Sequence, residues 1–300
     1  MIIEAIKFGI IKEIKQGECK LKFTKMHGTG NDFILTEYEE IIGADLSVPE
    51  IAERICERHF GVGADGLMFA MESCVADIKM KYYNSDGTKA EMCGNGIRCF
   101  ARYAYDSGKV SDRKFSIETD AGIYNVELLE QCLVEVEMGE PLTDAVSVPA
   151  IGGKEGKFLK AGIKTRFGIL EASSVRMGVP HTVVFEKGDK SFDVEKWGFE
   201  LERLKEVFPE GTNVNFVKVI SPKNISVETW ERGAGKTLSC GTGVCASAYL
   251  AHFFGLVDEN VYVKVPGGGL SISIREDSLY MKGEAVLICR GDYFMETCSL

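Results

Sequence analysis

Two four-residue stretches decide how this chain is organised: CGNG at Cys93–Gly96 and CGTG at Cys240–Gly243. The two cysteines are 147 positions apart, and moving the chain by that amount superposes the stretches without a gap. Further positions match under the same shift: Ile78 with Ile225, Tyr83 with Trp230, Ala101 with Ala248, Ala104 with Ala251, Gly108 with Gly255 and Val110 with Val257. Helix boundaries explain repeated glycines, but they do not explain a cysteine in the same position before two helices. We therefore predict an internal duplication that gives two domains of like fold.

Strand and helix signals alternate on both sides of the two stretches. Apolar residues at helical spacing, followed by glycine, predict helices at Gly94–Ser107 and Gly241–Phe254. Short apolar or alternating runs predict strands at 78–83, 115–117, 124–129, 133–136, 183–185, 214–219, 225–230, 270–274 and 285–289. Gly139-Glu140-Pro141 interrupts the pattern and is a candidate domain boundary. The fold class expected from this alternation is α/β (α+β).

Composition and charge exclude several classes of protein. The chain has 300 residues, of which 45% are hydrophobic and 27% charged, which is typical of a soluble globular protein. The net charge of −10, with no basic run, argues against a nucleic-acid partner. A membrane partner is not expected either, because no apolar run reaches the length of a membrane span and no basic amphipathic helix occurs.

Ten cysteines are many for a chain whose first twenty residues do not read as a secretory signal peptide. We expect a reducing, cytoplasmic compartment in which most thiols are free and buried. This expectation covers eight cysteines that belong to no duplicated motif: Cys19, Cys56, Cys74, Cys99, Cys132, Cys245, Cys289 and Cys298. Cys93 and Cys240 differ from them because each directly precedes a glycine-rich helix start.

The position of these two cysteines favours one kind of chemistry. The first turn of a helix has unpaired N–H groups and partial positive charge, so it stabilises a thiolate and lowers the pKa of the thiol. Two such helix ends could hold a carboxylate between them, with one thiol on either side. A thiolate and a thiol on opposite faces of an α-carbon could remove and return its proton, which inverts the stereocentre.

Other uses of the two cysteines are less favoured. The spacings from Cys93 to Cys99 and from Cys240 to Cys245 do not fit a zinc site, so no metal is expected. A cysteine hydrolase would leave the second motif unexplained, and two buried structural thiols remain the simplest alternative. No lysine stands out as a Schiff-base site, so no cofactor is expected.

Six segments resemble the diaminopimelate epimerase family, which comprises cofactor-independent amino-acid epimerases. They are KMHGTGNDF (25–33), RHFGVGADG (58–66), YNSDGTKAEMCGNGIRC (83–99), MGVPH (177–181), GTNVNF (211–216) and ERGAGKTLSCGTG (231–243). The resemblance implies two pseudo-symmetric domains, each a β-sheet wrapped around a central helix, with the site between them. The expected limits are an N-terminal extension at 1–20, a first domain at 21–139 plus 289–300, and a second domain at 140–288.

The resemblance also implies roles for particular residues. Cys93 and Cys240 would be the acid/base pair, and the backbone of Gly94, Asn95, Gly241 and Thr242 would hold the reacting carboxylate. Positions that would contact substrate are Asn31, Asn84, Asn213, Glu231 and Arg232, and His181 is expected near the site. Glu231 can accept from an ammonium group and Arg232 can bind a carboxylate, which suits a second amino-acid head.

Two departures from the family pattern bear on the substrate. The family often has an amide residue where this chain has Gly66, and an asparagine where it has Val179. Each lost hydrogen bond to a buried partner costs about 1–3 kcal/mol. Epimerisation of diaminopimelate is therefore the first hypothesis, and racemisation of another amino acid, such as histidine, is the second. A non-catalytic or isomerase relative is the third, and a homodimer is one option for a partner beyond the small-molecule substrate.

Overall fold

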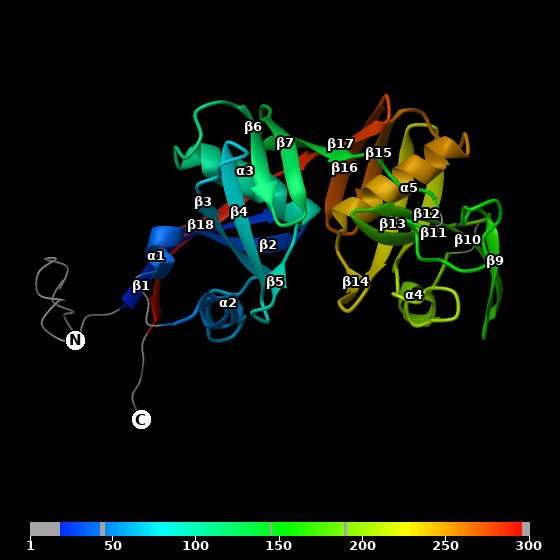
Figure 1. Ribbon diagram of the computed structural model, residues 1–300, viewed down its shortest axis with the longest axis horizontal. Helices are drawn as coiled ribbons and strands as arrows, with labels where there is room; N and C mark the ends of the chain where they lie inside the picture. Colours follow the sequence, from blue (N-terminus) through cyan, green and yellow to red (C-terminus); the bar gives the residue numbers. More distant parts are fainter. Residues whose placement is uncertain (1–18, 43–45, 145, 189–190, 296–300) are drawn as a thin grey trace, which may run out of the picture.

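A computed structural model describes residues 19–42, 46–144, 146–188 and 191–295. Most of the expected N-terminal extension, residues 1–18, lies outside the described residues, as does Cys298. Cys19 and Lys20, the last two residues of that expected extension, already belong to the first strand. Two similar halves lie side by side along the long axis of the molecule (Figure 1).

Each half contains one long helix and a run of strands in a matching order. The first half comprises β1 (Cys19–Gly28), β2 (Asn31–Glu37), α1 (Tyr38–Ile42), α2 (Val48–Cys56), β3 (Gly66–Met71), β4 (Ile78–Asn84), β5 (Lys89–Ala90), α3 (Gly94–Asp106), β6 (Lys114–Thr119), β7 (Gly122–Leu128) and β8 (Leu133–Gly139). The second comprises β9 (Ala161–Thr165), β10 (Gly168–Met177), β11 (Val179–Phe185), α4 (Val194–Glu202), β12 (Asn213–Ser221), β13 (Asn224–Glu231), β14 (Gly235–Thr237), α5 (Gly241–Phe253), β15 (Asn260–Val265), β16 (Gly268–Arg275) and β17 (Ser278–Glu284).

Strand pairing confirms the predicted duplication. In the first half β2 pairs with β3 in parallel and β4 pairs with β6 in parallel. In the second half β11 and β12 pair in parallel, and so do β13 and β15. The antiparallel pairs correspond as well: β1–β2 with β10–β11, β3–β4 with β12–β13, and β7–β8 with β16–β17. One topology is therefore built twice from different residues.

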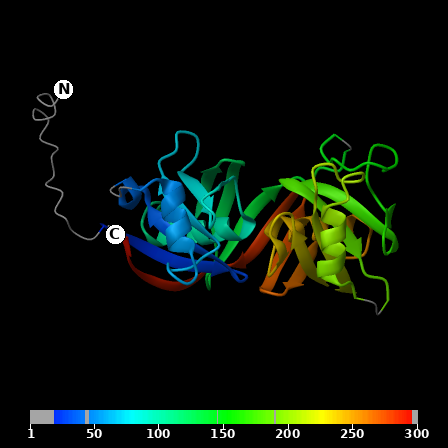
Figure 2. The ribbon, with the colours of Figure 1, turned by 90° about the horizontal axis from the view of Figure 1, so that it is seen from below.

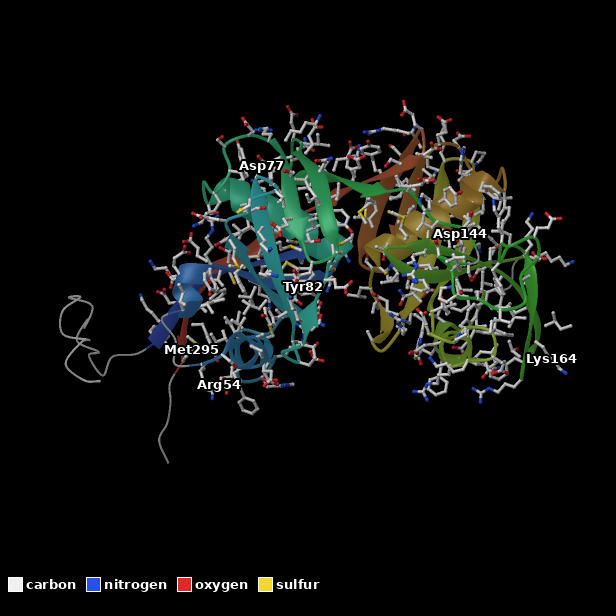
Figure 3. The ribbon with its side chains drawn as sticks, viewed as in Figure 1. Arg54, Asp77, Tyr82, Asp144, Lys164 and Met295 are labelled. Atoms are coloured by element: carbon white, nitrogen blue, oxygen red, sulfur yellow. The ribbon has the colours of Figure 1, made fainter. Side chains whose placement is uncertain are left out.

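The last strand, β18 (Val286–Met295), connects the two halves. The chain leaves β17 in the second half and returns to the first, where β18 lies antiparallel along β1 (Figure 2). Strands β8 and β17 also pair directly, so all the strands belong to one continuous sheet. Lys164 in β9 and Met295 at the end of β18 lie toward opposite ends of the molecule (Figure 3).

The core of each half lies between its long helix and the sheet that wraps around it. Strands β4 and β8 alternate buried and half-buried residues, which places one face of each toward the helix. In α3 Ile97, Phe100 and Ala104 are buried, whereas α5 buries mainly small residues such as Ala248 and Ala251. The predicted wrapped-helix architecture is thus confirmed. Within the described ranges, no helix is long and apolar enough to cross a membrane.

Candidate active site

The N-terminal ends of α3 and α5 meet at the junction of the two halves (Figure 1). Cys93 is the N-cap residue of α3 and Cys240 is the N-cap residue of α5, and both have an extended backbone. A Cβ atom added at Gly241 would lie 3.1 Å from Gly94 Cα, and one added at Gly94 would lie 3.3 Å from Gly241 Cα. A side chain at either position would crowd the other helix end, so the two glycines favour this close approach, and the approach brings both cysteines to one place.

Cys93 contacts the end of β2 through Asn31. Its Sγ donates to Asn31 Oδ1 at 3.4 Å, and Asn31 Nδ2 in turn donates to Asp65 Oδ2. Asp65 also accepts from Arg58 Nη2 at 2.7 Å. These contacts fix the Asn31 amide with its oxygen toward the thiol. Asp65 and Arg58 were not among the predicted site residues, although both lie in the RHFGVGADG segment that resembles the family.

Cys240 lies at the end of a buried hydrogen-bonded chain. Its Sγ is 3.5 Å from Thr242 Oγ1, which is 3.0 Å from His181 Nε2, and His181 Nδ1 is 3.3 Å from Asn215 Nδ2. Because the Asn215 amide nitrogen also donates to the backbone oxygen of Thr182, it is the donor to His181. His181 Nδ1 therefore accepts, Nε2 carries the proton and donates to Thr242, and the Thr242 hydroxyl hydrogen is left for the sulfur of Cys240.

The structure corrects the expectation that both thiols have a lowered pKa. Burial raises the pKa of Cys93 to about 11, and it raises that of Cys240 well above its usual value. Backbone N–H groups of the first helical turns oppose the rise, as expected, while the nearby charge of Glu231 adds to it. The loss of water around the two sulfurs therefore outweighs the effect of the helix ends on the thiol pKa values.

Glu231 and Asn213 lie at neighbouring ends of β13 and β12. Glu231 Oε1 accepts from Thr237 Oγ1 at 2.6 Å, and burial raises the pKa of its carboxyl group, against hydrogen bonds from Thr237 and the Cys240 thiol. Asn213 Oδ1 accepts from the backbone N–H of Arg232 at 2.8 Å. The exposed Arg232 side chain donates to the backbone oxygen of Glu210 at 2.7 Å. That acceptor is neutral, and no carboxylate among the described residues forms an ion pair with this guanidinium.

Asn84 occupies the corresponding strand end in the first half. It lies opposite Gly66 in the register of β3 and β4, and its Nδ2 donates to Thr88 Oγ1 at 3.0 Å. The shift of 147 places Gly66 on Asn213 and Asn84 on Glu231. At these equivalent points the second half offers the polar side chains of Asn213 and Glu231, whereas the first half offers that of Asn84 alone.

A sequence model of one family, described as "Diaminopimelate epimerase", matches residues 23–143 and 173–288. This chain belongs to the diaminopimelate epimerase family. Diaminopimelate epimerases of Caldanaerobacter subterraneus subsp. tengcongensis and Clostridium perfringens are 45% and 44% identical to it. Each comparison covers 91% of this chain and 99% of the relative.

Solved structures at low sequence identity share the fold. A probable proline racemase from Agrobacterium radiobacter has a TM-score of 0.68 at 15% identity, and the comparison covers 93% of this chain and 94% of that chain. A phenazine biosynthesis protein from Bacillus anthracis has a TM-score of 0.64 at 16% identity, and the comparison covers 92% of this chain and 99% of that chain. These similarities concern the fold alone.

Gly66 and Val179, the two departures from the family pattern, lie at the starts of β3 and β11. A Cβ atom at Gly66 would lie 2.5 Å from Tyr82 Cε2 and 2.6 Å from the backbone oxygen of Tyr83, so no amide side chain fits there. Tyr82, labelled in Figure 3, fills that space from the neighbouring strand β4. Val179 begins β11 and pairs with Met177 across a turn at Gly178. At Gly66, the ring of Tyr82 therefore occupies the space that an amide side chain would need.

The Asn95 side chain has a role that the sequence did not suggest. Only its backbone was expected at the site, but its Nδ2 donates to the backbone oxygen of Ser239 at 3.0 Å, and its Oδ1 accepts from Thr29 Oγ1 at 3.1 Å. Asn95 thus connects the first turn of α3 to the segment before α5.

Two surface cavities have linings that include neither Cys93 nor Cys240. One surface cavity is lined by Lys114, Glu135 and Arg275 among others, and a second by Arg166, Trp230 and Lys236 among others. In the part of the chain that the structure describes, no three His, Cys, Asp or Glu side chains are grouped closely enough to hold a metal ion.

Proposed function

We propose that this protein interconverts the LL and meso isomers of diaminopimelate, with Cys93 and Cys240 as the base and the acid. The observation that carries the proposal is the meeting of two cysteine-capped helix ends in a member of this family. Relatives that carry the name diaminopimelate epimerase match nearly the full length of the chain, which supports the choice of substrate.

The proposed mechanism places the α-carboxylate of the substrate between the two helix ends. Backbone N–H groups of Gly94, Asn95, Gly241 and Thr242 would bind it and stabilise the charge that develops when the α-proton leaves. The thiolate on one face takes the α-proton, and the thiol on the opposite face donates its proton to the carbanion. The reverse reaction exchanges the two roles. The raised pKa values of the two thiols would make either thiolate a strong base once it forms.

The distal head of diaminopimelate would bind at the strand ends that surround the helices. Glu231 is partly buried beside Cys240 and can accept from the distal ammonium group, while the exposed Arg232 can bind the distal carboxylate. Three amides, from Asn31, Asn84 and Asn213, would complete the polar lining. Such a site would select against amino acids that lack a second head.

Incubation with LL-diaminopimelate in D₂O, followed by chiral chromatography and mass spectrometry, tests this proposal. We expect meso product that carries deuterium at the inverted α-carbon. Absence of both meso product and α-deuterium would overturn it. A parallel panel of single L-amino acids, L-histidine included, tests the alternative that Val179 and Gly66 point to another substrate. Racemisation of one of these without turnover of diaminopimelate would replace the proposal by that alternative.

Removal of either thiol should abolish epimerisation. We expect Cys93→Ala and Cys240→Ala each to lower kcat by a factor of about 10³ or more, because general acid or base catalysis alone contributes 10²–10⁴-fold. Cys74→Ser is the matched control, since Cys74 is an exposed free cysteine far from either helix start in sequence. Meso product at the wild-type rate from either alanine variant would show that the facing thiols are not the acid and base.

The proposal extends to the domain limits and to the compartment. We infer a first domain at 21–139 plus 289–300 and a second at 140–288, and the return of β18 to β1 supports a discontinuous first domain. A reducing, cytoplasmic compartment follows from the mechanism, because both thiols must stay unpaired. Limited proteolysis that cuts near Gly139 and leaves two protected fragments would support these limits.

A further inference from the structure

Arg98 in α3 is a buried cation held only by uncharged acceptors. Its side chain is 0% exposed and is among the largest fully buried side chains of the molecule. The guanidinium donates to Gly94 O and Asn95 Oδ1 at 3.0 Å each, and to Thr29 Oγ1 and Glu284 O at 3.4 Å each. Among the described residues it forms no ion pair with a carboxylate. Buried charges are normally paired, whereas this one is bonded to neutral acceptors alone in the part of the chain that the structure describes.

The wrapped-helix fold does not itself require this cation. The shift of 147 places Arg98 on Cys245, which is fully buried at the equivalent turn of α5. The second half therefore builds the same topology around a small, neutral side chain. Glycines from both halves lie against the guanidinium: a Cβ atom at Gly28 in β1 would lie 2.9 Å from Nη2, and one at Gly283 in β17 would lie 3.0 Å from Nε and 2.3 Å from Leu270 Cδ2.

The position of the guanidinium links its charge to the first turn of α3. Gly94 O, which accepts from Arg98 Nη1, belongs to the same peptide unit as the backbone N–H of Asn95. That N–H is one of the groups hydrogen-bonded to the Cys93 thiol. A hydrogen bond from a cation to the carbonyl polarises the peptide and strengthens its N–H as a donor. The charge therefore acts through one peptide unit on whatever anion lies at the helix start.

We propose that Arg98 is a positioning residue of the anion site, whose uncompensated charge stabilises the Cys93 thiolate and a bound carboxylate through the first turn of α3. The carboxylate part of this proposal rests on the proposed function, whereas the thiolate part does not. Among the described residues, no cation lies at the equivalent turn behind Cys240: its helix has Cys245 there, and beside the thiol lie the Glu231 carboxyl group and the neutral chain through Thr242 and His181. Arg98 should thus act more strongly on Cys93 than on Cys240.

Other groups also act on the Cys93 thiol, so the test must isolate Arg98. The charged and titratable groups near it are Glu231 from β13, Cys240 from α5, Tyr82 from β4, and Arg98 and Cys99 from α3. Replacing Arg98 alone leaves the others in place. Arg102→Met is the matched control, since Arg102 lies one turn later on α3 and forms an ordinary ion pair with Asp106.

The first measurement uses no substrate. The rate at which iodoacetamide alkylates Cys93 is followed against pH by peptide mass mapping in the wild type, Arg98→Met, Arg98→Lys and Arg102→Met. We expect Arg98→Met to raise the apparent pKa of Cys93 by about one unit or more, so that alkylation at pH 8 slows about tenfold. Arg98→Lys should stay closer to the wild type because it retains the charge, and Arg102→Met should match the wild type.

The second measurement uses LL-diaminopimelate in D₂O. We expect Arg98→Met to lower kcat/KM about tenfold or more and to slow α-deuterium incorporation to the same extent. A wild-type protein that lacks epimerase activity but shows the shifted Cys93 titration in Arg98→Met would overturn the proposed function and leave the thiolate role of Arg98 intact.

The proposal is wrong if folded Arg98→Met retains the Cys93 titration of the wild type. Should that variant fail to fold, Arg98→Gln, which keeps hydrogen-bond donors without charge, is compared with Arg98→Lys. Equal Cys93 titration curves for these two variants would show that the charge has no effect on the thiol and that Arg98 is only structural.

Discussion

His181 is a fully buried histidine whose imidazole must remain neutral. Burial, with a smaller effect from the charge of Arg232, lowers the pKa of His181 to about 3. Its two ring nitrogens are both used, one as acceptor from Asn215 and one as donor to Thr242. Protonation would give Nδ1 a hydrogen that faces the Asn215 amide donor, so the folded state resists protonation for geometric as well as electrostatic reasons.

This residue makes stability depend on pH in a defined window. The unfolded state binds a proton near pH 6.5 and the folded state only near pH 3, so acidification between these values favours unfolding. From pH 7 to pH 5 the loss due to His181 should be about 2 kcal/mol of unfolding free energy. Urea unfolding of the wild type and His181→Gln at both values measures it, with the variant losing less on acidification.

His59→Gln is the control for that experiment, because the His59 side chain is 84% exposed and paired with Glu57. It should show the same pH dependence as the wild type. Identical pH dependence in His181→Gln and the wild type would mean that His181 is not kept neutral by burial.

The starts of α3 and α5 differ in what lies beneath their third residue. A Cβ atom at Gly96 would lie 2.1 Å from Met68 Cε, the flexible end of a long side chain, whereas one at Gly243 would lie 2.3 Å from Asn215 Oδ1. Asn215 cannot move easily, because it is buried and bonded to Thr229 and His181. Equivalent glycines in the two helices therefore have unequal importance.

Substitution of these two glycines by alanine should change the unfolding free energy of the protein by different amounts. Alanine stabilises a helix by about 0.8–1 kcal/mol relative to glycine. In Gly96→Ala a shift of Met68 should leave the net change in unfolding free energy within about 1 kcal/mol of zero. In Gly243→Ala overpacking against Asn215 should destabilise the protein by about 1–3 kcal/mol. Thermal unfolding measures both effects.

A second substitution checks the cause of that difference. Asn215→Ala removes the obstructing amide, so Gly243→Ala should cost less in its presence than alone. Equal Tm values for Gly96→Ala and Gly243→Ala would show that Asn215 is not held as rigidly as its hydrogen bonds indicate.

At the scale of the whole molecule, a cluster of three buried, hydrogen-bonded polar residues joins the two halves next to the helix ends. Thr29 and Asn95 come from the first half and Ser239 from the second, and all three are at most 5% exposed. The hydroxyl groups of Thr29 and Ser239 are hydrogen-bonded at 2.9 Å, and Asn95 Nδ2 donates to Ser239 O at 3.0 Å. The two helix ends are therefore held in place from both sides of the junction.

A double-mutant cycle measures the coupling energy between Thr29 and Ser239 in this cluster. Thr29→Val and Ser239→Ala should each destabilise the protein, and together they should cost less than the sum of the two, with a coupling energy of about 1 kcal/mol. Ser239→Ala combined with Ser107→Ala is the control, because Ser107 bonds only within the end of α3. That pair should be additive. An additive Thr29/Ser239 pair would mean that the two hydroxyl groups do not stabilise each other.

Local patterns accounted for part of this architecture and missed another part. The helices at Gly94 and Gly241 were predicted within one residue of their ends, because periodicity and a following glycine are local signals. Helix α2 was missed, although Ser47 and Glu50 form a capping box before it that the sequence displays. Arg98 and Asn215 were not predicted as site residues. Both lie in segments that resemble the family, but no local pattern in these segments indicates what the two side chains contact.

The sequence by itself determined the duplication, the two cysteine-capped helices and the family, because each depends on residue order within short segments. Only the tertiary structure decided the direction of the thiol pKa shifts and the partners of His181 and Arg98. Desolvation is a sum over atoms from many strands, and the hydrogen-bond partners of a buried group are distant in the chain, so neither can be read from a local pattern.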